Sequence, residues 1–251
     1  MNVGFKKFSN NADYFFFSDS DIVLSYNNIC NVMKECFNYD AVNPYSEIYD
    51  TTESVHDNKV KLYEYYNYND FSVIQSSNLM KGKRAHACFS GGLVGLSKES
   101  MYLISGWDER FRGRGWEDYA FTAKIKLFLS NIHTFDWKAL HLYHPPEAST
   151  TRLINSKLNR EYESYTTFDY SLQIINSSDY FGSIDKYSDG NTQFELNIDK
   201  ETFKNALINA RTIFENILMN TRKKHEFNSE DEYNKMVYYN LCEQHDCDTH
   251  E

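Results

Sequence analysis

The chain has 251 residues, 41% of them apolar and 16% aromatic, which excludes an elongated disordered tail and suffices for a large folded core. A formal net charge of −10 repels phosphate backbones, so non-specific nucleic-acid binding is not expected. The chain lacks an apolar run of the roughly 18–20 residues that an integral membrane segment needs, and its amino terminus lacks the apolar region of a signal peptide. Five scattered cysteines favour reduced thiols and a cytoplasmic location.

The first predicted element is a strand over the aromatic run 14–17. Such a continuous run is typical of a strand that is buried on both faces, as in a parallel sheet. The run is followed by Asp19-Ser20-Asp21 and then by the apolar residues 22–24. Carboxylates at the carboxyl end of a buried strand lie where open α/β sheets bind ligands.

Residues 38–72 are rich in tyrosine and asparagine with weak periodicity, and we interpret them as a variable insert containing an edge strand or hairpin. A short helix is predicted over residues 98–105, with Ser97 as its N-cap and Gly106 as its left-handed stop. A second helix should begin near Trp116, after a glycine-rich turn.

The four-residue spacing of Phe121, Ile125 and Leu129 predicts the buried stripe of that second helix.

The clearest helix in the sequence covers residues 199–220, with Asp199 as its cap, and its pattern indicates a role in packing. A polar, acidic and frayed end should follow. The predicted apolar face of the helix over 199–220 consists of Phe203, Ala206, Leu207, Ala210, Phe214, Ile217 and Leu218.

The carboxylates of Asp19 and Asp21 suit a divalent cation. In an extended strand both lie on the same side, about 7 Å apart. Hard oxygen donors of this kind hold Mg²⁺ or Mn²⁺ beside a diphosphate, where the ion neutralises charge on a leaving group. The alternative interpretation is a solvated turn that ends the strand.

Glu117 and Asp118 stand at a predicted helix start beside a glycine-bearing loop. Either carboxylate is able to accept a proton from a hydroxyl that attacks a sugar. The alternative is that these acids only complement the helix dipole, which is common.

His141 and His144 lie three residues apart in a predicted extended segment. Alternation along such a segment turns the two side chains to opposite sides, so at most one should meet a metal ion. A single imidazole completing an oxygen-rich site is chemically reasonable. The alternative is an ordinary surface or core histidine.

Four segments, taken together and in order, resemble GT-A glycosyltransferases. Residues 13–22 (DYFFFSDSDI) look like the DxD strand of that fold. Residues 89–97 (FSGGLVGLS) and 106–118 (GWDERFRGRGWED) are similar to a block shared by family 2 glycosyltransferases and the carboxy-terminal domain of β-1,4-galactosyltransferases. Residues 141–145 (HLYHP) resemble the histidine segment that follows that block.

The resemblance implies a nucleotide-sugar transferase that uses Mn²⁺ or Mg²⁺. Asp21 would coordinate the metal, and Asp19 would assist through the ribose or a water molecule. His144, and less so His141, would be the remaining metal ligand. Asp118 would act as general base of an inverting transfer to an acceptor hydroxyl on a glycan or protein.

The same resemblance implies several substrate-binding residues. Glu117 would position acceptor or donor hydroxyls, and Gly91 and Gly92 would line the sugar pocket. Trp107 or Trp116 would stack on a sugar face. Trp116 stands where a glycine is common in the family, which implies an acceptor site of different shape.

The fold implied for residues 1–150 is the carboxyl half of a GT-A, Rossmann-like α/β fold, with a helical, acidic extension over 151–251. The nucleotide-binding amino-terminal half of that fold is expected to be missing from this chain, either because another chain supplies it or because the chain is a truncated or split product. One alternative is a non-catalytic remnant that binds sugar or a partner protein, and another is a metal-dependent phosphohydrolase. Separately, a tail cluster offers four possible zinc ligands, or is simply a solvated acidic end: Cys242, His245, Cys247 and His250.

Overall fold

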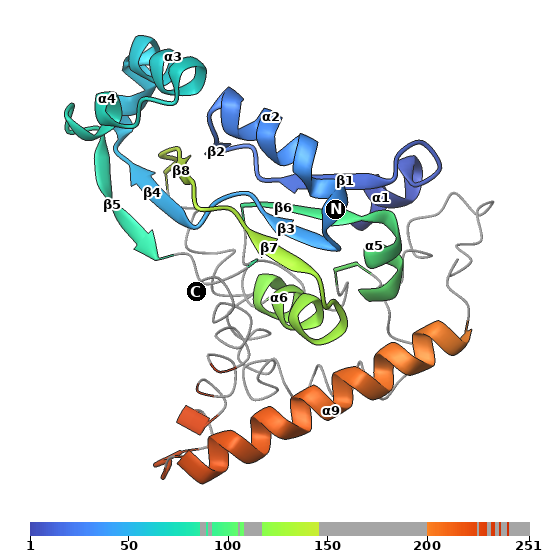
Figure 1. Cartoon of the computed structure of the whole chain (residues 1–251). Coiled ribbons are helices and arrows are strands. Elements are labelled where there is room, and N and C mark those ends of the chain that lie inside the picture. The colour runs from blue at the N-terminus through green and yellow to red at the C-terminus, as the bar shows by residue number, and fades with distance from the viewer. Residues whose placement is uncertain are drawn as a thin grey trace. The chain divides into compact units, whose positions relative to one another are not determined.

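The structure, a computed structural model, is a mixed α/β fold with helices and two four-stranded sheets (Figure 1). It describes residues 1–85, 89, 92–104, 106–107, 117–145, 200–224, 226–229, 232–233, 236 and 240. The chain divides into two compact units, which do not follow the predicted boundary at residue 150. The first unit comprises Met1–Asp13, Lys98–Ile132 and Glu147–Glu251, and the second comprises Tyr14–Ser97 and His133–Pro146.

The first unit is helical in its described part, and three of its helices confirm the sequence predictions. Phe121, Ile125 and Leu129 are all buried, but so is every residue from 121 to 129, so the helix is covered on all sides rather than along one stripe. The helices are α1 (Asn2–Phe8), α5 (Lys98–Ile104), α6 (Glu117–Phe128) and α9 (Lys200–Lys224).

A buried lysine joins α6 to the end of α5. Lys124 is 1% exposed, and its Nζ donates to the carbonyl oxygens of Ile104 at 3.2 Å and Gly106 at 2.7 Å. These bonds satisfy carbonyl groups that the end of a helix leaves unpaired, and the cation complements the helix dipole there. Gly106 has a φ of +61°, which confirms the predicted left-handed stop.

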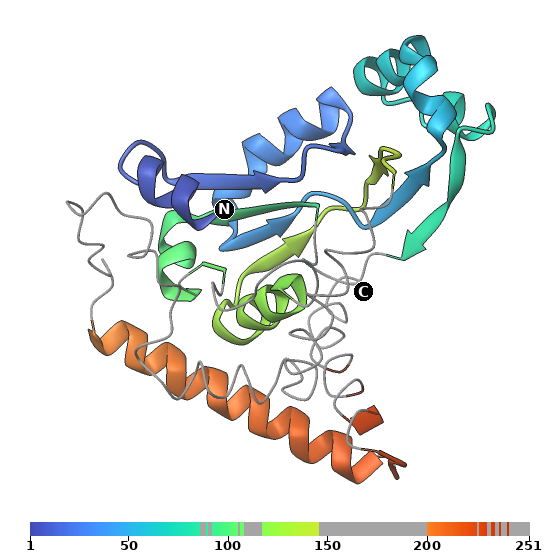
Figure 2. The same cartoon turned by 180° about the vertical axis from the view of Figure 1, so that it is seen from behind.

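The long helix α9 packs against α6 along one face (Figures 1 and 2). Ala210, Phe214 and Ile217 are buried, as the periodicity predicts, and Thr221 extends the same face. None of the helices in the described part of the chain is long and apolar enough to cross a membrane.

The second unit holds both sheets, with strand orders β1-β6-β3-β7 and β2-β8-β4-β5. β4 and β8 run parallel, whereas β1–β6, β3–β6, β2–β8 and β4–β5 are antiparallel. The strands are β1 (Tyr14–Ser18), β2 (Ile22–Val23), β3 (Ala41–Asn43), β4 (Glu47–Thr51), β5 (Met80–Ala85), β6 (Leu93–Ser97), β7 (Ile132–Thr134) and β8 (Lys138–His141). The helices are α2 (Tyr26–Glu35), η1 (Cys36–Asn38), η2 (Glu53–Asp57), α3 (Lys59–Tyr68) and α4 (Ser72–Gln75).

The prediction that β1 is buried on both faces in a parallel sheet is wrong. Within the described strands β1 lies at the edge of its sheet and pairs antiparallel with β6 alone. Phe17 is 9% exposed but Phe16 is 36% exposed. Phe15 stacks on Phe17, while Tyr14 contacts Phe16 on the other side, so each face of the strand carries one aromatic pair.

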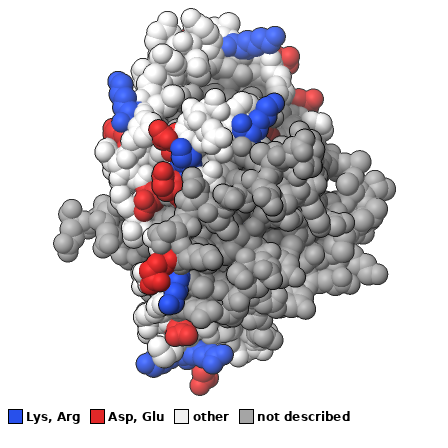
Figure 3. Space-filling model, turned by 90° about the vertical axis from the view of Figure 1, so that its right-hand side faces the viewer, with Lys and Arg blue, Asp and Glu red and all other residues white. Residues whose placement is uncertain are grey.

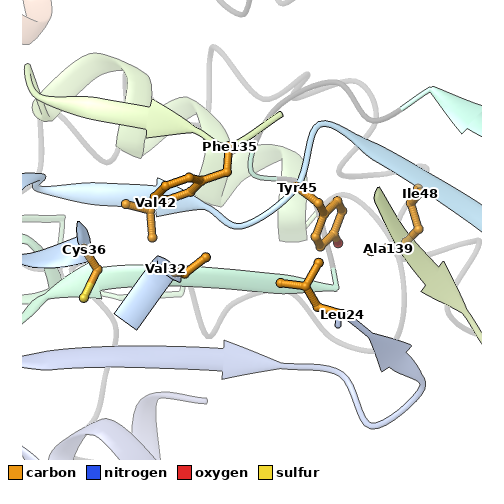
Figure 4. Close-up of a cluster of buried hydrophobic side chains, with 8 residues drawn as sticks. All are labelled: Leu24, Val32, Cys36, Val42, Tyr45, Ile48, Phe135 and Ala139. Atoms are coloured by element: carbon orange, nitrogen blue, oxygen red, sulfur yellow. The ribbon is translucent and has the colours of Figure 1, made fainter. Parts of the chain in front are cut away.

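The expectation that residues 38–72 contain an edge strand or hairpin is also wrong. This segment supplies β3, which lies inside one sheet, and β4, which lies inside the other. Aromatic and aliphatic side chains of the segment help to fill a core that holds both sheets together (Figure 4). The core residues are Leu24, Val32, Cys36, Val42, Tyr45, Ile48, Phe135 and Ala139.

Charges of both signs are interspersed among the described residues of the face in Figure 3. One of the described ion pairs joins Lys83 of β5 to Glu47 of β4. Lys83, together with the hydroxyl of Tyr49, holds the pKa of Glu47 below its usual value. Such exposed ion pairs contribute little to the free energy of unfolding, so packing of the buried core contributes more to it.

His133 should make this fold less stable in mild acid. Its ring stacks on Tyr39 and contacts Phe135 edge-on, with centroids 4.6 Å away in both cases. Burial lowers the pKa of His133 and outweighs the opposing effect of Glu35. The unfolded chain therefore takes up a proton more readily, so stability is complete above about pH 6.5 and falls below it.

The expected result is a lower urea midpoint at pH 5.5 than at pH 7.5, with a smaller decrease in His133→Phe, which keeps the aromatic contacts but does not titrate. Equal decreases in wild type and in His133→Phe would show that His133 is not the cause of the lower stability in acid.

Candidate metal centre

Asp21 stands in a turn between β1 and β2, not in an extended strand as predicted. The turn separates two strands that belong to different sheets, β1 and β2. Asp19 and Asp21 therefore have different partners. The Asp21 carbonyl oxygen accepts from the Leu142 N–H at 2.8 Å, which fixes the turn beside the end of β8.

His141 and His144 face the same carboxylate, so the prediction that they point to opposite sides is wrong. Nε2 of each ring lies 3.5 Å from Oδ2 of Asp21. β8 ends at His141, so strand alternation does not govern the direction of the His144 side chain. The two rings are nearly perpendicular, with centroids 5.4 Å apart.

These three side chains fit a single metal ion. One donor atom from each of Asp21, His141 and His144 lies within 4.8 Å of the other two. Two ligand atoms that are each about 2.1 Å from one ion, at angles between a right angle and the tetrahedral angle, are about 3.0–3.4 Å apart. The separations of 3.5 Å are close to this range and long for a direct hydrogen bond.

Nδ1 of each ring lies near an oxygen atom, and Nε2 is therefore the nitrogen available to a metal. Nδ1 of His141 lies 2.8 Å from Oδ1 of Asp50, and Nδ1 of His144 lies 3.2 Å from the Pro145 carbonyl oxygen. Carboxylates and carbonyls only accept hydrogen bonds, so in the neutral rings the proton belongs on Nδ1. The Nε2 lone pairs then face Asp21, as metal ligation requires.

Asp50 is a site residue that the sequence does not reveal. It belongs to the tyrosine-rich segment and is 91 residues from His141, with no spacing motif between them. The only local feature that marks it in the sequence is an acidic residue near the end of a short strand. The parallel pairing of β4 with β8, in which Asp50 is the register partner of His141, brings the two together.

Asp19 does not join the metal ligands among the described residues. Its backbone N–H donates to the Gly92 carbonyl at 2.6 Å, and its Oδ2 accepts from the Gly92 N–H at 3.3 Å. Gly92 has a φ of +85°, and a Cβ there would lie 2.2 Å from the Tyr45 hydroxyl. Glycine is therefore required at this position by the backbone and by the approach of Tyr45. Gly91 lies outside the described residues.

The predicted catalytic acids belong to the other unit. Glu117 begins α6, as expected, and Asp118 in its first turn is half-buried. Trp107 stacks on Phe121 with centroids 3.6 Å apart, so one face of its ring has a protein partner. Trp116 lies outside the described residues.

The predicted zinc cluster in the tail, like Trp116, falls outside the described residues.

Comparisons of the chain with family models, curated proteins and solved structures found no match. The function of the chain is therefore inferred from its own residues.

Proposed function

We propose that the chain is a metal-dependent glycosyltransferase of GT-A type, which transfers a sugar from a nucleoside-diphosphate sugar to an acceptor hydroxyl with inversion. The observation that carries this proposal is the convergence of Asp21, His141 and His144 on one point. These residues come from two separate segments, and the family resemblance independently names both segments as sources of metal ligands.

Mn²⁺ suits this donor set better than Mg²⁺. Mg²⁺ prefers oxygen ligands and keeps several waters, whereas two of the three donors here are imidazole nitrogens. The side chains of Asp21 and His144 are 29% and 39% exposed, which leaves a side of the centre open to a diphosphate. Bound there, the ion would supply charge neutralisation for the departing nucleoside diphosphate.

In this proposal the chain's other residues carry the transfer. The Asp118 carboxylate accepts the proton of the acceptor hydroxyl, whose oxygen forms a bond to the anomeric carbon. The bond between that carbon and the diphosphate oxygen breaks, and its electron pair leaves with the nucleoside diphosphate. Glu117 and Asp19 orient sugar and ribose hydroxyls, and a tryptophan such as Trp107 covers an apolar sugar face.

Asp118→Asn tests the enzyme assignment. Release of nucleoside diphosphate from a panel of nucleotide sugars, with Mn²⁺ and candidate acceptors, should fall by about 10²–10⁴-fold, because removal of a general base costs about that much. The surface variant Asp136→Asn is the matched control and should retain full activity.

Two results would contradict the proposal. If wild-type protein binds nucleotide sugars but never releases the diphosphate, the chain is a sugar-binding protein. If Asp118→Asn is as active as wild type, Asp118 is not the base.

A further inference from the structure

The ends of three neighbouring strands surround His141. β8 lies between β2 and β4 in its sheet. Asp21 immediately precedes β2, and Asp50 is the next-to-last residue of β4. The final residue of β8 is therefore placed between a carboxylate from each neighbouring strand, and the two carboxylates contact different nitrogens of its ring.

Asp50 contacts the nitrogen that faces away from Asp21. Its Oδ1 lies 2.8 Å from Nδ1 of His141, the length of a charge-assisted hydrogen bond. Because a carboxylate only accepts, this contact favours the Nδ1–H form of a neutral ring and directs the Nε2 lone pair at Asp21.

Thr51 determines the path of the chain between the two histidines. It is 2% exposed, and its hydroxyl donates to the His141 carbonyl at 3.1 Å while accepting from the Tyr143 N–H at 2.8 Å. Nε2 of His56 lies 2.7 Å from the Tyr143 carbonyl oxygen and adds a further contact. These bonds hold the backbone after β8, where His144 approaches the same carboxylate as His141.

An irregularity in the sheet coincides with this pair. Asp50 pairs with Gly82 of β5, but Thr51 pairs with Met80, so Lys81 is an extra residue on the β5 side. Bulges of this kind change the direction of side chains and are frequent next to functional sites. The irregularity therefore lies at the same two residues of β4, Asp50 and Thr51, that contact β8.

We propose that Asp50 and Thr51 are positioning residues of the metal centre: Asp50 selects the metal-binding tautomer of His141, and Thr51 fixes the path of the chain that brings His144 to the ion. This inference rests on the metal centre proposed above.

The tautomer can be observed without any metal. In long-range ¹H–¹⁵N spectra of metal-free protein at pH 7.5, with His141→Gln used for assignment, the neutral form of the His141 ring should carry its proton on Nδ1. Asp50→Ala should move most of this signal to the Nε2–H form, the usual preference of a free ring. A wild-type ring with its proton on Nε2, or an unchanged tautomer in Asp50→Ala, overturns the role of Asp50.

Metal affinity provides the second measurement, made by calorimetric titration with Mn²⁺ and Zn²⁺. Asp50→Ala should weaken binding by about 10–100-fold, as is typical when an outer-shell partner of a metal ligand is lost. Asp50→Asn keeps an acceptor and should lose less.

Thr51→Val should weaken binding similarly, and Thr51→Ser, which restores the hydroxyl, should recover it. The matched controls are Thr52→Val, whose hydroxyl contacts Leu79, and Asp136→Ala, whose carboxylate accepts from Ser46. Both should bind as wild type, and thermal unfolding confirms that each variant is folded.

The outcomes separate the two proposals. If wild type binds Mn²⁺ and the Asp50 and Thr51 variants bind equally well, the positioning inference is wrong and the metal centre stands. If wild type binds neither ion, the metal centre itself is wrong, whatever the tautomer of His141.

Discussion

Asp21→Ala is expected to weaken Mn²⁺ binding by more than about 100-fold, because loss of an outer-shell partner alone typically costs 10–100-fold. Asp21 provides the one carboxylate of the three-residue cluster, and its Oδ2 is the atom that both Nε2 nitrogens approach. Without it, two neutral imidazoles remain, and they attract a dication far less strongly.

The measurement is calorimetric titration, with electron paramagnetic resonance to count bound Mn²⁺. His141→Ala and His144→Ala should each reduce affinity as well, since the structure places both rings at the carboxylate. Asp136→Ala removes an exposed carboxylate of the same unit and serves as the control. Unchanged affinity in Asp21→Ala would remove the basis of the proposed metal centre.

Phe135→Ala is expected to lower the free energy of unfolding by about 3–5 kcal/mol, as for other large-to-small substitutions of buried phenylalanine. Phe135 is 5% exposed, stacks on Trp137 with centroids 4.5 Å apart, and donates its backbone N–H to Asn43. It belongs to the core in Figure 4, which also includes Ala139 from the strand that ends at His141.

Urea unfolding followed by circular dichroism measures this loss. Phe37→Ala is the matched control, because its ring is 69% exposed and surface substitutions usually change stability by less than about 1 kcal/mol. Similar losses in the two variants would show that the core around Phe135 does not dominate the stability of this unit.

Local sequence patterns predicted α5, α6 and α9 but gave no prediction of α2, α3 and α4. The spacing of Phe121, Ile125 and Leu129 gave a helix that the structure places from Glu117, and Gly106 ends the helix before it. Helical periodicity and a positive φ at glycine depend on interactions within a few residues, so they can be recognised without knowing the fold.

Burial and strand pairing were predicted poorly. The aromatic run 14–17 indicated a strand but not that the strand lies at an edge, and residues 38–72 gave no sign of two interior strands. A short apolar run does not specify its neighbours, because strand partners are chosen by contacts between residues far apart in the chain.

For the candidate site, the sequence by itself determined the chemical types: Asp21 and the two histidines were recognisable as possible ligands. Only the tertiary structure decided that His141 and His144 face one carboxylate and that Asp50 contacts the first of them. The physical reason is that backbone alternation fixes side-chain direction only while a strand continues. Beyond the end of β8, direction is set by Thr51 and by the parallel pairing with β4, across about 90 residues of sequence.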